Sequence, residues 1–169
     1  MKSYSLATWK GTEKFRETAE AYVAGWPPVK PVMFLTGVVG GGKTGLAVGI
    51  LRELWQTHHK VGRFVSAPDL IQRFIQSFKD EATEAPENIH TEMATAALIV
   101  LDDYGTEKGT EFAQQEMYRL INGRSSRGQP LIVTTNLEVQ SLDPRIKSRL
   151  VDRERSTWME FSGSDRREM

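Results

Sequence analysis

Cysteine is absent from the 169 residues, and histidine occurs only three times. The first absence excludes disulfides, thiolate zinc sites and thiol nucleophiles, and His58, His59 and His90 lack the spacing of a metal site. Long hydrophobic runs are also missing, since the longest, residues 93–101, is about half of a membrane span. The N-terminus leads into no apolar segment of the kind found in secretory signals. These absences predict a cytoplasmic protein that makes no contact with a membrane.

The composition is ordinary for a globular domain. Hydrophobic residues make up 39% and charged residues 26%, which argues against a disordered, collagen-like or coiled-coil chain. The net charge of zero hides an acidic middle, residues 80–111, between basic flanks. We expect the acidic residues before the Asp-Asp pair to form a solvated loop face; they are Asp80, Glu81, Glu84, Glu87 and Glu92. The basic flanks are compatible with nucleic-acid binding but do not require it.

Short apolar runs alternate along the chain with segments of helical periodicity. Strands are expected at residues 32–36, 63–66, 97–101, 130–133 and 157–161. Helices are expected at residues 12–24, 43–60, 68–78 and 112–122, and a short one opens at Asp143-Pro144. Residues 80–90 are expected to form a polar loop. Five strands separated by helices predict a parallel sheet with helices on both faces.

The strongest motif lies between the first strand and the helix that follows it. The segment Gly37-Val38-Val39-Gly40-Gly41-Gly42-Lys43-Thr44 fits the phosphate-loop pattern G-x-x-x-x-G-K-[ST] without a gap. A triphosphate concentrates negative charge, so such a loop must bring backbone N–H groups close to it, and glycine accepts the backbone angles that this requires. The helix N-terminus adds partial positive charge. The expected ATP-binding residues are Gly37, Gly40, Gly41, Gly42, Lys43, Thr44 and Gly45; the alternative is a flexible glycine turn.

Two adjacent carboxylates, Asp102 and Asp103, end a buried strand. Their mutual repulsion and desolvation are costly unless a cation is bound beside them. We therefore expect Asp102 and the Thr44 hydroxyl to bind Mg²⁺, Lys43 to contact the β- and γ-phosphates, and Asp103 to orient the attacking water. The alternative is a strand that simply ends in a polar turn.

An asparagine and a pair of arginines are further candidates for the site. Asn136 follows a buried strand at its carboxyl end, where such sheets bind ligands, and it either holds the attacking water or caps a turn. Arg145 and Arg149 are four residues apart and share one helix face. Arginine stabilises charge on a transferring phosphoryl group, often from a neighbouring subunit, whereas many surface arginines are only solvated.

In this order the motifs closely resemble the AAA+ ATPase domain of bacterial and phage replicative helicase loaders of the DnaC and DnaI type, with IstB transposition helpers as near relatives. The resemblance covers residues 10–167 and rests on the phosphate loop and on residues 101–108, 118–124, 134–137, 145–150 and 163–167. It implies a three-layer P-loop NTPase fold with a five-stranded parallel sheet in the order 5-1-4-3-2. It also implies one domain over residues 1–169, with an N-terminal helix and linker (1–30), a P-loop core (31–169) and an absent or minimal lid.

The resemblance also implies roles for individual residues. Lys43 and Thr44 match Walker A, Asp102 and Asp103 match Walker B, Asn136 matches sensor 1, Arg149 the arginine finger and Arg167 sensor 2. Thr110 and Phe112 match a region where loaders contact single-stranded DNA, and an aromatic side chain there stacks on a base. The alternative for Phe112 is a place in the helix core. Tyr4 and Trp9 lie where such domains often contact adenine.

The function implied is that of a Mg²⁺-dependent ATPase, slow on its own, that hydrolyses ATP to ADP and phosphate. It would assemble as a homo-oligomer, with Arg149 acting in trans, and help to load a DnaB-type replicative helicase onto single-stranded DNA in DNA replication. Two alternatives stay open. One is an IstB-like ATPase that assists a transposase on duplex DNA. The other is a non-hydrolysing, ATP-dependent assembly switch in which Asp103, shorter than the glutamate of many AAA+ proteins, is a poor catalyst.

Overall fold

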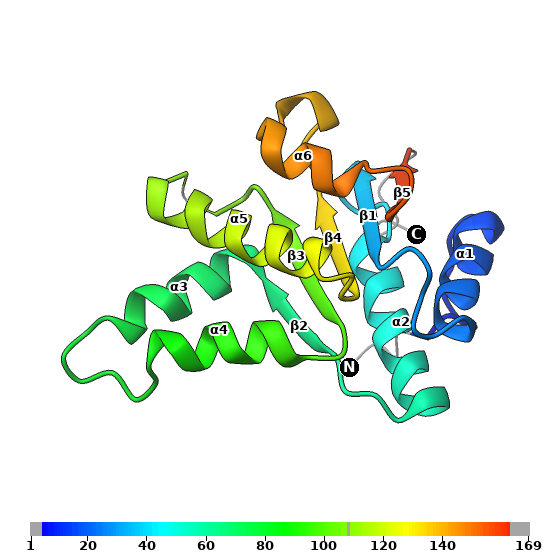
Figure 1. Cartoon of the computed structure of the whole chain (residues 1–169). Coiled ribbons are helices and arrows are strands. Elements are labelled where there is room, and N and C mark those ends of the chain that lie inside the picture. The colour runs from blue at the N-terminus through cyan, green and yellow to red at the C-terminus, as the bar shows by residue number, and fades with distance from the viewer. Residues whose placement is uncertain (1–4, 108, 163–169) are drawn as a thin grey trace.

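A five-stranded parallel sheet forms the centre of the computed structural model, which describes residues 5–107 and 109–162 (Figure 1). Its strands are β1 (Val32–Gly37), β2 (Arg63–Ser66), β3 (Ile99–Tyr104), β4 (Leu131–Thr135) and β5 (Ser156–Phe161). They lie in the order β2-β3-β4-β1-β5, and every pairing is parallel. This arrangement confirms the predicted fold class and sheet order.

Helices cover both faces of the sheet (Figure 1). They are α1 (Glu13–Ala24), α2 (Lys43–His58), α3 (Ala67–Ser77), α4 (Pro86–Thr95), α5 (Glu111–Ser126) and α6 (Pro144–Leu150), with a short 3-10 helix, η1, at Val139–Ser141. Because successive strand residues point to opposite faces, Val32 and Phe34 pack with α3, α4, α5 and α6, whereas Met33 and Leu35 pack with α1 and α2. Of the helices in the described segments, none has both the length and the apolar character needed to span a lipid bilayer.

Three predicted boundaries are wrong by three or more residues. One is the end of α5, which was expected at residue 122 and lies at Ser126. Residues 80–90 do not form a loop throughout, because α4 begins at Pro86 and buries Ile89 and Met93, four residues apart, on one face. With so few apolar residues in an acidic stretch, the helical period is weak in the sequence. The third strand runs from Ile99 to Tyr104, so both acidic residues of the Asp-Asp pair lie within it and not after it.

Candidate nucleotide-binding site

The loop between β1 and α2 turns tightly against the end of β5. Gly37 and Gly42 have φ angles of 116° and 97°, in the left-handed region that favours glycine. A Cβ atom on Gly37 would lie 2.0 Å from the carbonyl oxygen of Phe161. That same carbonyl accepts a hydrogen bond of 3.0 Å from the Val38 N–H. Glycine at these two positions therefore lets the loop approach β5 and then enter α2 directly.

Lys43, the first residue of α2, is buried and turns its side chain back over the loop. Its Nζ donates hydrogen bonds to the carbonyl oxygens of Gly37 (2.8 Å) and Val38 (2.6 Å). It also donates to Oδ1 of Asn136 (2.8 Å), which follows the end of β4. Two residues predicted to belong to one site, 93 positions apart in the sequence, are thus in direct contact.

Asp102, on β3, is buried and holds two hydroxyl groups. Its Oδ1 accepts hydrogen bonds from Thr44 Oγ1 (2.9 Å) and from Thr134 Oγ1 (2.7 Å). Burial raises the pKa of Asp102, the bonds from Thr134 and Thr44 oppose the rise, and the nearby charge of Asp103 adds to it, while that of Lys43 lowers it. The carboxyl ends of three parallel strands therefore bring Lys43, Thr44, Asp102 and Asn136 to one edge of the sheet.

The backbone at Asp103 interrupts the sheet. Its φ angle is 53°, which is uncommon for a residue other than glycine, and the register between β3 and β4 shifts between Leu101 and Tyr104. The Asp103 N–H donates to Thr134 Oγ1 (3.0 Å), so the Thr134 hydroxyl links both acidic residues. Asp103 is half-buried, unlike its buried neighbour Asp102, and its carboxylate has more access to water.

The donor set at this edge fits Mg²⁺. The Thr44 hydroxyl and the Asp102 carboxylate lie side by side, and Mg²⁺ prefers oxygen ligands and usually keeps several positions for phosphate oxygens and water. In the residues that the structure describes, no group of three or more His, Asp and Glu side chains could hold a metal by itself. An ion bound by Thr44 and Asp102 would therefore take its other ligands from a nucleotide and from solvent.

Both arginines of α6 contact α5, as their predicted common face requires. Arg149 Nε donates to Asn122 Oδ1 (3.0 Å), and the Arg145 guanidinium lies 4.8 Å from the centre of the Tyr118 ring. The structure therefore places Arg149 beside α5 and not with Lys43 and Asp102 of the same chain. Arg167, expected as a second sensor, lies outside the described residues.

The two residues expected to contact DNA have structural partners. Thr110 caps α5, since its Oγ1 accepts a hydrogen bond from the Ala113 N–H (3.2 Å). Phe112 is half-buried and packs edge-on against Phe74 and Phe78 of the α3 region, at ring distances of 6.4 and 5.8 Å. Phe78 is 63% exposed and extends this aromatic group to the surface.

Residues outside the motifs also support the loop. Trp9 Nε1 donates to the carbonyl oxygen of Gly42 (3.0 Å), and the Trp9 ring packs edge-on against Phe161 at 6.3 Å. The resemblance placed Trp9 near a nucleotide, but no sequence signal indicated that Phe161 would reach the loop. Tyr4 lies outside the described residues.

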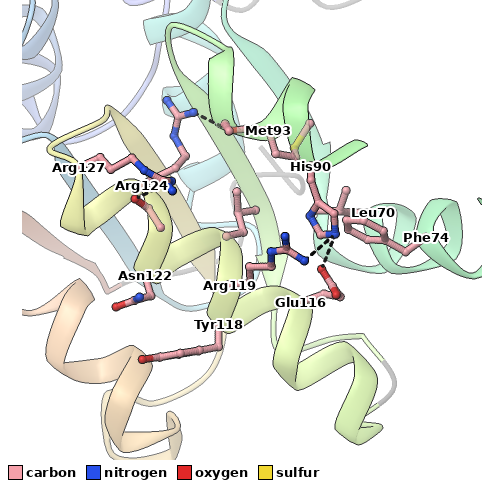
Figure 2. Close-up of a pocket in the computed structure, with 13 residues that line it drawn as sticks. Leu70, Phe74, His90, Met93, Glu116, Tyr118, Arg119, Asn122, Arg124 and Arg127 are labelled. Atoms are coloured by element: carbon pink, nitrogen blue, oxygen red, sulfur yellow. Dashed lines mark hydrogen bonds and ion pairs between the residues drawn. The ribbon is translucent and has the colours of Figure 1, made fainter. Parts of the chain in front are cut away.

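A hollow of about 410 Å³ lies elsewhere, between α3, α4 and α5 (Figure 2). Within it His90 Nε2 lies 3.0 Å from Arg119 Nη1 and 3.5 Å from Glu116 Oε2. At the other end the buried Arg124 donates to main-chain carbonyl oxygens. No residue of the phosphate loop lines this hollow, so it is separate from the candidate nucleotide site.

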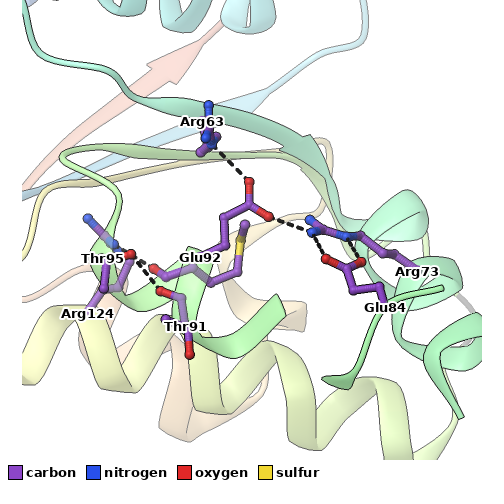
Figure 3. Close-up of polar contacts among 8 residues, drawn as sticks. Arg63, Arg73, Glu84, Thr91, Glu92, Thr95 and Arg124 are labelled. Carbon is purple, nitrogen blue, oxygen red and sulfur yellow. Dashed lines mark hydrogen bonds and ion pairs between the residues drawn. The ribbon is translucent and has the colours of Figure 1, made fainter. Parts of the chain in front are cut away.

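Ion pairs join β2, α3 and α4 beside that hollow (Figure 3). Glu92 accepts from Arg63 Nε (2.9 Å) and from Arg73 Nη2 (2.6 Å), and Arg73 Nε donates to Glu84 (2.7 Å). The expectation that the acidic stretch is only a solvated face is therefore wrong for Glu84 and Glu92. Both are paired with arginines of preceding elements.

Comparison with known proteins agrees with this architecture. The family model for the bacterial DnaA ATPase domain matches residues 10–153. The chain is 24% identical over 130 residues to the replicative helicase loader DnaC of Escherichia coli (strain K12), an alignment that covers 75% of this chain and 52% of DnaC. It is 25% identical over 151 residues to the chromosomal replication initiator protein DnaA of Cereibacter sphaeroides (strain ATCC 17029), covering 86% and 32%. The chain thus spans about half the length of that DnaC and a third of that DnaA.

Solved structures share the fold. The crystal structure of the DnaC helicase loader has a TM-score of 0.76 at 21% identity, over 94% of this chain and 97% of that one. The replication initiator DnaA bound to AMPPCP and single-stranded DNA has a TM-score of 0.80 at 20% identity, over 97% and 51%. These similarities confirm the P-loop AAA+ fold. With the family match over most of its length, the chain belongs to the bacterial DnaA ATPase domain family.

Proposed function

We propose that this chain is a Mg²⁺-dependent ATPase that helps to load a replicative helicase onto single-stranded DNA. The observation that carries the proposal is the meeting of Lys43, Thr44, Asp102 and Asn136 at one edge of the sheet. This arrangement occurs in a chain of the DnaA ATPase family that is also similar to a helicase loader. ATP and Mg²⁺ are the cofactors, and a DnaB-type helicase is the partner.

Nucleotide binding begins at the phosphate loop. The backbone N–H groups of the loop and the first turn of α2 donate to the phosphates, and Lys43 neutralises charge on the β- and γ-phosphates. Thr44 and Asp102 hold Mg²⁺, which when bound withdraws charge from the phosphate oxygens. The hydroxyl of Thr134 keeps the Asp102 carboxylate in place for this role.

Hydrolysis needs a positioned water and a group that receives its proton. Asn136 contacts Lys43 and therefore lies beside the expected position of the γ-phosphate, where its amide orients the water. The half-buried Asp103 accepts the proton. Arg149 of a neighbouring copy stabilises the charge that develops as the γ-phosphoryl group leaves ADP. The side chain of Asp103 is shorter than that of glutamate, which favours slow turnover and also supports the second candidate function, an ATP-dependent assembly switch.

Support for single-stranded DNA comes from two directions. The similar DnaA structure holds single-stranded DNA together with AMPPCP. In this chain Phe112 and the exposed Phe78 form an aromatic group at the start of α5, and bases stack on such rings regardless of sequence. Thr110, the cap of α5, lies two residues before Phe112 in the sequence and would contact the sugar-phosphate backbone of the DNA.

The test is capture of the cognate replicative helicase by the tagged chain, with and without Mg-ATP. We expect capture that depends on ATP and is lost in Lys43→Ala, with ATP hydrolysis stimulated by single-stranded DNA at several salt concentrations. Stimulation by duplex DNA alone, without helicase capture, would instead support an IstB-like transposition helper. ATP-dependent oligomers that release no phosphate would support the assembly switch.

A further inference from the structure

A second hollow, of about 290 Å³, opens between the last turns of α2 and the segment that leads into β2. Leu51, Trp55, Lys60, Val61 and Gly62 line it. A Cβ atom on Gly62 would lie 2.3 Å from Leu51 Cδ2, so the absence of a side chain there keeps the two segments close together. Trp55 is 54% exposed and Val61 53%, which leaves an unusual amount of apolar surface in contact with water.

The sheet beside this hollow has an uncovered face at its edge strand. Val65 packs against the core that contains α3, so Phe64, its neighbour on β2, points to the opposite face, where α2 lies. Phe64 is 45% exposed, and the core on the α2 side contains no residue of β2. The chain leaves the end of α2 and turns back into β2 beside it (Figure 1). Since helices normally cover both faces of such a sheet, a further helix fits next to α2 over β2.

The charged side chain that lines the hollow is basic. It is Lys60, which is exposed to solvent. Glu53 lies about 200° around the helix from Leu51 and therefore on its far side. An apolar hollow with a basic flank complements a segment that carries Asp and Glu beside its hydrophobic residues.

We propose that the hollow between α2 and β2 binds an acidic amphipathic helix of a partner protein. The apolar residues of that helix would pack against Leu51, Trp55 and Phe64, and its carboxylates would face Lys60. The lining is mostly apolar and includes one lysine, which favours packed apolar side chains over a nucleic acid, whose phosphates need several cationic contacts. The hollow lies at the opposite end of α2 from the phosphate loop, so the proposal does not depend on ATP hydrolysis.

The test uses the full chain and two synthetic amphipathic helices of about 18 residues that share one apolar face. One has glutamate on its polar face and the other has lysine. By fluorescence anisotropy we expect the glutamate helix to bind and the affinity to fall about tenfold in Trp55→Ala. Trp158→Ala removes a similarly exposed tryptophan from β5 and should leave the affinity unchanged. Lys60→Glu should weaken binding, whereas Lys79→Glu, at another exposed lysine, should not.

Several results would overturn the proposal. These are equal binding of the lysine helix, an unchanged affinity in Trp55→Ala, or no binding of the glutamate helix up to about 1 mM. Loss of oligo-dT binding in Trp55→Ala, without peptide binding, would assign the surface to nucleic acid instead. A self-associated chain that dissociates on Trp55→Ala would assign it to a second copy. Thermal melts of each variant establish that the fold is kept.

Discussion

Lys43 Nζ donates to Asn136 Oδ1 across 2.8 Å, and this bond joins the first turn of α2 to the end of β4. The same ammonium group holds two carbonyl oxygens of the phosphate loop. A nucleotide bound at the loop would meet the charge of Lys43 and the amide of Asn136 together. The two residues nevertheless have different proposed roles, and substitution separates them.

Asn136→Ala should affect turnover and spare binding. Removing an amide that orients water lowers kcat by about 100-fold, while Lys43 still binds the phosphates, so the Kd for ATP stays within about threefold. Lys43→Ala should abolish detectable ATP binding. Calorimetry and phosphate release measure the two effects, with Asn88→Ala, an exposed residue of α4, as the control. Normal turnover in Asn136→Ala would contradict the proposed role.

Arg149→Ala should lower hydrolysis about 1000-fold and leave ATP binding unchanged, because the guanidinium acts on the γ-phosphate of a neighbouring copy. Mixing Arg149→Ala with Lys43→Ala should restore part of the activity. Some interfaces in the mixture combine an intact loop with an intact arginine. Arg145→Ala, on the same face of α6, is the matched control. If the mixture stays inactive while each variant still oligomerises, an arginine in trans is wrong.

Acid should destabilise the protein through Glu84. The Arg73 guanidinium hydrogen-bonds to this carboxylate and holds the pKa of Glu84 below its usual range. A carboxyl group with a lowered pKa in the folded state stabilises the fold above its ordinary pKa of about 4, and the contribution is lost as pH falls through the folded value. The Tm of the wild type should therefore fall more steeply than that of Glu84→Gln between about pH 6 and pH 3. Glu87→Gln should follow the wild-type profile.

Arg124→Met should destabilise the fold. Arg124 is 1% exposed, and its guanidinium donates 2.7–3.1 Å bonds to the carbonyl oxygens of Met93, Ala96 and Pro130. Burial lowers the pKa of Arg124 to about 10, which leaves it charged at neutral pH. The substitution leaves three carbonyl oxygens without their hydrogen-bond donor, which lowers the free energy of unfolding by about 3 kcal/mol. Urea titration measures this cost, and Arg127→Met, at the exposed residue that directly follows this helix, should be nearly neutral.

Much of the fold could be predicted because its signals are local. Apolar runs mark the strands, and glycine and Lys43 mark the loop within eight consecutive residues. The sheet order came from the family resemblance. α4 escaped prediction because Ile89 and Met93 alone supply its buried face.

The rest depends on tertiary contacts. The left-handed backbone of Asp103 follows from the irregular pairing of β3 with β4, and no residue type there indicates it. The pairing of Glu92 with Arg73 requires α3 and α4 to pack side by side, and that of Glu84 requires the segment between these helices to fold back onto α3. The composition of the sequence shows that these residues are acidic but does not show which arginines they contact.

The hydrogen bond from Trp9 to the Gly42 carbonyl gives the molecule an intrinsic optical probe. That carbonyl also accepts the Leu46 N–H, so the indole touches the peptide group at which α2 starts. Any rearrangement of the loop on ligand uptake must alter the polarity around this ring. With Trp26, Trp55 and Trp158 replaced by phenylalanine, the emission of Trp9 can therefore follow loop occupancy in real time, without an added label.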